Sequence, residues 1–249
     1  DGDSLQFKAL PKLPIALSNA DAIQIQSTLY VAGGLDPEGA SDCMLSIDLS
    51  AENLKWTTLA KLPEKLSHAV VAGQSDGTED CVYVIGGRNK TGLTSTFLSD
   101  IWKYSPSSNQ WTNAGLLKLN NEPGFGLSAG TGVSFGDRWI VLFGGDKGII
   151  FNQTKTLNDL LTHAPEGIEK DKLLKEKDEL LSNHPGFYKD ILAYNTRSSE
   201  LIKIGEIPGK TQVTTSAFWW NNQVIIPSGE ILPGRRTPEI TSIQLVQEK

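Results

Sequence analysis

The chain has 249 residues, with 23 lysine and arginine residues against 29 aspartate and glutamate residues, so its formal net charge is −6. An acidic chain without a basic block is a poor match for nucleic acid or an anionic membrane, and we expect neither as a partner. No apolar run approaches the roughly 20 residues that a membrane-spanning helix needs. The two cysteines, Cys43 and Cys81, form neither a disulfide framework nor a structural zinc set, and we expect no metal site.

The first predicted elements are short apolar strands that end at glycine and recur along the chain. Each copy is rich in β-branched residues, which predicts a buried strand followed by a turn. Three copies end in a glycine pair, whereas the degenerate fourth copy has Gly229-Glu230 where the others have Gly-Gly. The copies span residues 29–34, 82–87, 140–145 and 224–230. Apolar residues and a tight turn precede each copy, which predicts a hairpin.

Two further strands complete each repeat. A third strand is predicted at 45–49, 101–104, 191–194 and 240–246. An outer strand is predicted at 7–10, 56–59, 111–114 and 201–204. The distance between successive glycine pairs is 53 and then 58 residues. Four strands at this period are typical of a kelch-type blade, so we expect an all-β fold, a β-propeller whose blades cover one another's faces.

One segment departs from the repeat. From Gly145 to Gly229 the spacing is 84 residues, about 30 more than the first period, and the excess lies at 151–187. Helices are predicted at 157–163 and 168–183, with Thr156 and Asp159 as a capping box. We therefore expect one propeller domain over 1–249 with a helical insertion at 151–187. The insertion is either a solvated helix pair or a lid over a pocket mouth.

The fourth copy carries the most unusual charges. After Glu230 comes a Pro233-Gly234 turn and then Arg235 and Arg236. The turn predicts that Glu230 and an arginine face one another near the propeller axis. A charged residue in such a place is either part of a structural ion pair or part of a functional site.

One stretch runs from Gly229-Glu230 through Pro233-Gly234 to Arg236-Thr237, and a second leads from Gly144-Gly145 into Phe151-Asn152. Together these stretches resemble the sialic acid mutarotases, or N-acetylneuraminate epimerases. The resemblance implies a cofactor-free bacterial enzyme, usually periplasmic, that interconverts the α and β anomers of N-acetylneuraminate. It also implies six kelch blades. In a cyclically permuted branch, two blades precede the segment seen here. We accordingly expect either two further N-terminal blades or a homo-oligomer; alternatively, the strand at 5–10 closes a four-bladed ring.

The resemblance implies roles for Glu230 and Arg236, because the family's acid/base glutamate and substrate-binding arginine stand six positions apart. A carboxylate can move a proton during ring opening. A guanidinium can bind the carboxylate of an acidic sugar with two parallel hydrogen bonds. Further substrate-binding candidates, chosen by their location near inner-strand starts or after glycine, are His68, Arg88, Asn89 and Asn152. The residues do not identify a second proton-transfer group.

Two other functions remain open at this stage. A kelch propeller that only binds other proteins predicts an exposed apolar patch and no convergent acid/base pair. A carbohydrate-binding or lyase-like propeller predicts a site for a different acidic sugar. Fold alone does not separate these functions, because propellers carry many of them.

Overall fold

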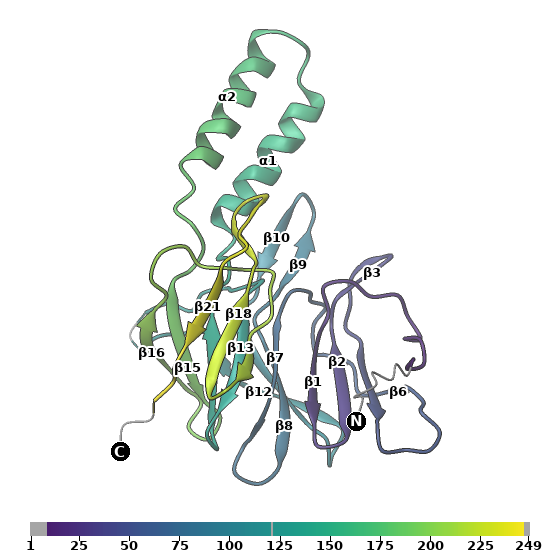
Figure 1. Ribbon diagram of the computed structural model, residues 1–249. Coiled ribbons are helices and arrows are strands. Elements are labelled where there is room, and N and C mark those ends of the chain that lie inside the picture. The colour runs from purple at the N-terminus through teal and green to yellow at the C-terminus, as the bar shows by residue number, and fades with distance from the viewer. Residues whose placement is uncertain (1–8, 121, 247–249) are drawn as a thin grey trace, which may run out of the picture.

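The computed structural model describes residues 9–120 and 122–246. It confirms the all-β expectation: four antiparallel sheets, which we number blades 1 to 4 along the chain, form a propeller arrangement (Figure 1). Their innermost strands are neighbours in chain order, from blade 1 to blade 4. The outer strand expected at residues 5–10 falls mainly outside the described residues.

Each blade is a meander in which neighbouring strands pair antiparallel. Blade 1 contains β1 (Asp21–Ile25), β2 (Thr28–Ala32), β5 (Met44–Asp48) and β6 (Thr57–Thr58). Blade 2 contains β7 (Val70–Ser75), β8 (Asp80–Ile85), β11 (Asp100–Ser105) and β12 (Gln110–Leu116). Blade 3 contains β13 (Thr131–Phe135), β14 (Trp139–Phe143), β15 (Asp190–Asn195) and β16 (Glu200–Glu206). Blade 4 contains β17 (Phe218–Trp220), β18 (Gln223–Pro227) and β21 (Ile240–Ile243).

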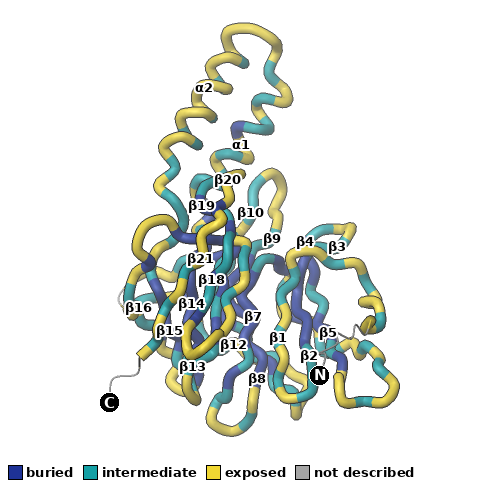
Figure 2. The backbone as a smooth tube through the Cα atoms, in the orientation of Figure 1, coloured by how far each residue is buried: buried dark blue, intermediate teal, exposed yellow. Residues whose placement is uncertain are grey.

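The core lies between the blades because alternate residues of a strand point to opposite faces. In β8, Val82 and Val84 pack toward blade 1, in a cluster with Met44. Tyr83 and Ile85 pack toward blade 3, in a second cluster. A third cluster joins blades 3 and 4. Figure 2 shows this buried region as dark blue along the central strands. Burial on both faces explains why these strands are continuous apolar runs rather than alternating ones.

A connection follows each glycine pair at the same end of the propeller (Figure 1). In blades 1, 2 and 4 this connection is a hairpin, and in blade 3 it is a pair of helices. The hairpins are β3–β4 (Leu35–Asp36 and Gly39–Ala40), β9–β10 (Arg88–Thr91 and Thr94–Phe97) and β19–β20 (Glu230–Leu232 and Arg235–Arg236). The helical insertion therefore replaces a hairpin at the end of the propeller where Glu230 lies.

The glycine pairs bring neighbouring blades together. The N–H of Gly87 donates to the carbonyl of Leu127 at the start of blade 3, at 2.8 Å. Gly87 has φ +99°, and a Cβ there would lie 2.9 Å from the carbonyl oxygen of Ser67. Only glycine meets both the dihedral and the spatial requirement without strain.

A ladder of backbone hydrogen bonds runs around the axis. Before each inner strand one residue has a left-handed conformation, with φ of 52° at Asn19, 56° at His68, 60° at Ala129 and 50° at Thr214. His68 N–H donates to Asn19 at 3.1 Å, Ala129 to His68 at 2.8 Å, and Thr214 to Ala129 at 3.0 Å. These bonds fix the start of each inner strand relative to the next blade.

The first helix begins earlier than the sequence predicted, at Ile149 rather than Leu157, whereas the second begins at the predicted Ile168. Helix α1 spans Ile149–His163 and α2 spans Ile168–Ser182. Gly148, with φ 86°, precedes α1, and the expected capping box is wrong: the hydroxyl of Thr156 bonds to the carbonyl of Asn152 inside the helix. Neither helix in the described part of the chain is long and apolar enough to cross a membrane.

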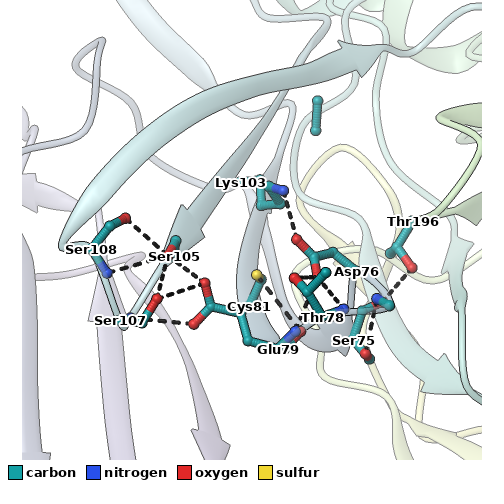
Figure 3. Close-up of polar contacts among 12 residues, drawn as sticks. Ser75, Asp76, Thr78, Glu79, Cys81, Lys103, Ser105, Ser107, Ser108 and Thr196 are labelled. Carbon is teal, nitrogen blue, oxygen red and sulfur yellow. Dashed lines mark hydrogen bonds and ion pairs between the residues drawn. The ribbon is translucent and has the colours of Figure 1, made fainter.

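Polar side chains secure the opposite end of blade 2 (Figure 3). Lys103 Nζ lies 2.8 Å from Oδ2 of Asp76, whose Oδ1 accepts the N–H of Thr78 at 2.8 Å and of Glu79 at 3.1 Å. The hydroxyl of Thr196 in blade 3 donates to the carbonyl of Ser75 at 2.6 Å. The turn between β7 and β8 is thereby tied to its own blade and to the next.

Candidate active site

A cavity of about 270 Å³ lies at the hairpin end of the propeller, between blades 2 to 4 and helix α1. This volume is close to the lower end of the range for small-molecule sites, about 300–1,000 Å³. Its polar and charged lining residues are Arg88, Asp146, Thr154, Lys155, Asn158, His184, Thr214 and Glu230, and its aromatic ones are Phe151 and Phe187. The cavity therefore combines both signs of charge with an aromatic wall.

Arg88, Asp146 and Glu230 occupy equivalent positions in blades 2, 3 and 4. Each follows directly on the glycine-pair position and exchanges two backbone hydrogen bonds with a residue at the start of an inner strand. Those partners are Ser67 for Arg88, Ser128 for Asp146 and Val213 for Glu230. The sequence alignment that placed Glu230 on a glycine position was wrong by one residue, because Ser228 (φ 50°) and Gly229 (φ 121°) take the pair's conformation.

Glu230 and Arg236 stand opposite one another in the β19–β20 hairpin, as the Pro-Gly turn predicted. Their charged groups nevertheless form no ion pair in the described structure. Glu230 lines the cavity and accepts a hydrogen bond from the N–H of Gly234 through Oε1. Arg236 is exposed, and its guanidinium donates to the carbonyl and the hydroxyl of Thr214, at 3.2 and 3.3 Å.

Arg88 is the guanidinium that lies in the cavity. Its Cζ lies 4.6 Å from the ring centre of Phe151 and 6.0 Å from that of Phe97, and Nη2 lies 3.1 Å from Nε2 of His68. Burial lowers the pKa of Arg88 below its usual value, while the carboxylates of Asp146 and Glu230 oppose that shift. An arginine with these contacts stays charged and has a restricted orientation.

His68 does not reach this cavity but lines an adjoining hollow of about 190 Å³ at the axis. Because a guanidinium only donates, Nε2 of His68 accepts from Arg88, which places the ring proton on Nδ1. Nδ1 lies 2.9 Å from the hydroxyl of Ser67 and donates to it. Burial first, and then the charge of Arg88, lower the pKa of His68 to about 4. The histidine is therefore neutral at pH 7 and serves to orient Arg88.

The two asparagine candidates lie outside the cavity lining. Asn89 is on β9, opposite Thr96 of the same hairpin. Asn152 accepts the N–H of Ser95 through Oδ1 and donates to the carbonyl of Ser95 through Nδ2, both at 2.9 Å. Its amide thus pairs helix α1 with the edge of β10, as another strand would.

Helix α1 supplies a wall of the cavity, through residues that the sequence prediction did not name as site residues. Phe151, Thr154, Lys155 and Asn158 recur at the spacing of one helix face, but the helix was expected to begin only at Leu157. His184, in the segment that returns from α2 to blade 3, is half-buried in the cavity wall.

Asp146 was also missed, although the repeat held the signal. In the sequence, Arg88 and Asp146 both directly follow a glycine pair, and the corrected alignment of blade 4 places Glu230 at the same position. No group of three histidine, cysteine, aspartate or glutamate side chains among the described residues is arranged to hold a metal ion. The described residues of the cavity lining therefore provide two carboxylates, cationic groups and a histidine as chemically active side chains.

Comparison with known proteins decides the family. A family model for N-acetylneuraminate epimerase matches residues 10–249. The chain belongs to the N-acetylneuraminate epimerase family. This membership confirms the resemblance drawn from the residues around Glu230 and Arg236.

The N-acetylneuraminate epimerase of Salmonella typhimurium is 30% identical over 234 residues, covering 93% of this chain and 57% of the relative. That of Haemophilus influenzae strain PittEE is 26% identical over 238 residues, covering 95% of this chain and 59% of the relative. A solved structure titled "Structure of YjhT" matches with a TM-score of 0.70 and 22% identity, covering 93% of this chain and 62% of that chain. The structural match supports the propeller fold. The chain spans a little over half the length of the epimerase relatives.

Proposed function

We propose that this protein is a mutarotase that interconverts the α and β anomers of N-acetylneuraminate or a closely related acidic sugar. Membership of the epimerase family supports an isomerase of this type. The observation that carries the proposal is the position of Glu230, a half-buried carboxylate at the edge of the cavity that also holds Arg88.

The reaction needs proton transfer at two oxygen atoms and a cation for the substrate's carboxylate. In our proposal Glu230 exchanges a proton with the sugar, since Oε2 has no protein partner among the described residues. The guanidinium groups of Arg88, within the cavity, and Arg236, at its margin beside Thr214, attract and orient the substrate carboxylate. A protein-binding module has no need of this convergence of charged groups in a cavity.

The activity is measured by following N-acetylneuraminate enriched in its α anomer by proton NMR. We expect the 249-residue protein to speed the approach to anomeric equilibrium in proportion to its concentration. Glu230→Gln keeps the size of the side chain and its acceptor for Gly234, and we expect a loss of about 100-fold or more, the usual size of an acid/base contribution. The anomers of glucose, which lacks a carboxylate, serve as the specificity control. A wild-type rate equal to that of buffer contradicts the proposal.

A further inference from the structure

The propeller places a second carboxylate in the position that Glu230 has. Asp146 in blade 3 and Glu230 in blade 4 both follow a glycine-pair position, and both have the same backbone pairing to an inner strand. Both side chains line the cavity. Equivalent backbone positions in adjacent blades give the two side chains equivalent starting points around the axis.

Both carboxylates are also held in the same manner. Asp146 accepts the N–H of Gly148 through Oδ1, at 2.8 Å, and Glu230 accepts the N–H of Gly234 through Oε1. Neither Oδ2 of Asp146 nor Oε2 of Glu230 has a protein partner in the described structure. Each group thus has one oriented oxygen and one oxygen that remains free for a ligand.

The two carboxylates share their electrostatic environment. Both act on Arg88, in the preceding blade, and on His184, in the loop returning from α2. Lys155 is a further cavity-lining cation, from α1. The two carboxylates therefore line one cavity whose cationic groups include Arg88 and Lys155.

We propose that Asp146 is the second proton-transfer group of the reaction, working as a pair with Glu230; this inference rests on the proposed function. Anomer exchange begins when the ionised member of the pair removes the proton of the anomeric hydroxyl, whose O–H electron pair forms the carbonyl of the open chain. The bond between the anomeric carbon and the ring oxygen breaks, and the protonated member gives its proton to the ring oxygen.

Closure on the other face of the carbonyl reverses both transfers. The ring hydroxyl returns its proton to the carboxylate that supplied it, and the new anomeric hydroxyl receives the proton held by the other. Atoms and electrons balance without an oxidant, a reductant or a cofactor. A single carboxylate has to perform both transfers in turn, whereas two oriented carboxylates perform them together.

The test compares Asp146→Asn with Glu230→Gln and the wild-type protein in the anomer assay. The asparagine side chain keeps the Oδ1 acceptor for Gly148 and the volume of the aspartate but cannot exchange the proton. We expect kcat to fall about 100-fold with a change in KM of less than about threefold, and one limb of the pH–rate profile to disappear. Asp159→Asn, on helix α1 but outside the cavity lining, is the control for loss of one negative charge and keeps the wild-type rate.

A second variant separates a chemical role from a structural one. Asp146→Ala removes the whole carboxylate, and added formate restores part of the rate if the missing group transfers a proton. A wild-type rate in Asp146→Asn together with a slow Glu230→Gln overturns this inference and leaves the proposed function standing. Failure of formate to restore any rate in Asp146→Ala, with α1 still protected from hydrogen exchange, overturns it as well. If the wild-type protein itself does not exceed the buffer rate, the proposed function falls together with this inference.

Discussion

The guanidinium Nη2 of Arg88 lies 3.1 Å from Nε2 of His68, so a cation in the candidate active site is oriented by a neutral histidine from the axis of the propeller. His68 is in turn held by the hydroxyl of Ser67, its neighbour in the chain. The contact links the axial hydrogen-bond ladder to the cavity, because the carbonyl of His68 accepts the N–H of Ala129 in the next blade.

The pKa of His68 makes the stability of the fold depend on pH. The value of about 4 in the folded protein lies below the ordinary 6.5, so the unfolded chain binds one more proton between these pH values. The free energy of unfolding therefore falls as the pH drops from 7 to 4, by about 2–3 kcal/mol for this group. Asparagine tolerates the positive φ of this position and does not titrate between pH 4 and pH 7. We therefore expect the His68→Asn variant to lose less free energy of unfolding than the wild-type protein between pH 7 and pH 4.

Urea unfolding at pH 7 and pH 4 measures this difference. His184, whose pKa burial also lowers, is present in both proteins and cancels in the comparison. Equal losses of stability in wild type and His68→Asn contradict the prediction.

The two arginines of the proposed site differ in their surroundings, and lysine substitutions distinguish their contributions. Arg88→Lys keeps the charge but loses the planar contact with Phe151 and the fork that binds a carboxylate with two bonds. We expect KM for N-acetylneuraminate to rise about 10- to 100-fold, the range for losing a charged hydrogen bond. Arg236→Lys is expected to raise KM in the same direction.

Arg235→Lys is the matched control, since Arg235 is exposed in the same hairpin and lies outside the cavity lining. An unchanged KM in both Arg88→Lys and Arg236→Lys contradicts the assignment of the carboxylate to these groups.

The amide of Asn152 attaches the helical insertion to blade 2. Asn152→Ala removes two hydrogen bonds to Ser95, which together contribute about 2 kcal/mol to holding α1 on β10. We expect backbone amides in the first half of α1 to exchange with deuterium about 10- to 30-fold faster. Gln153→Ala is the control on the same helix, because that side chain is exposed. Equal exchange in both variants contradicts a docking role for Asn152.

The ion pair between Asp76 and Lys103 is the most enclosed lysine–carboxylate pair of the described structure, with side chains 14% and 27% exposed. Burial alone raises the pKa of Asp76, but hydrogen bonds from Lys103, Thr78 and the turn backbone (Figure 3) more than offset it and hold the pKa well below the usual range. The stability from this group is present above about pH 4 and is lost as the pH falls toward the folded-state pKa.

Asp76→Asn keeps the turn's acceptor but removes the charge. We expect it to lower the free energy of unfolding by about 1–3 kcal/mol at pH 7, and we expect a smaller difference from wild type at pH 3. Asp137→Asn removes a carboxylate that is 58% exposed and paired with Arg197 and Arg138, and changes stability by less than about 1 kcal/mol. Urea midpoints at both pH values check this prediction. If the stability difference between Asp76→Asn and wild type is not smaller at pH 3 than at pH 7, the stabilisation by Asp76 is not ionic in origin.

The sequence by itself determined the propeller and the region of its candidate site. Apolar strands ending in glycine are local signals that recur at a fixed period, and blades with two apolar faces must stack on one another. The motif from Glu230 to Arg236 is likewise contiguous and pointed to the family without any structure. The insertion was predicted for the same reason, since it interrupts that period.

Only the tertiary structure decided which charged groups share the cavity. Arg88, Asp146 and Glu230 are separated by 58 and 84 residues, and radial stacking of three blades brings them to one rim. The orientation of Arg88 by His68 and the wall formed by Phe151 and Lys155 depend on where α1 begins and how it docks on β10. Local propensity does not encode those contacts, because they join segments that meet only when the blades have packed.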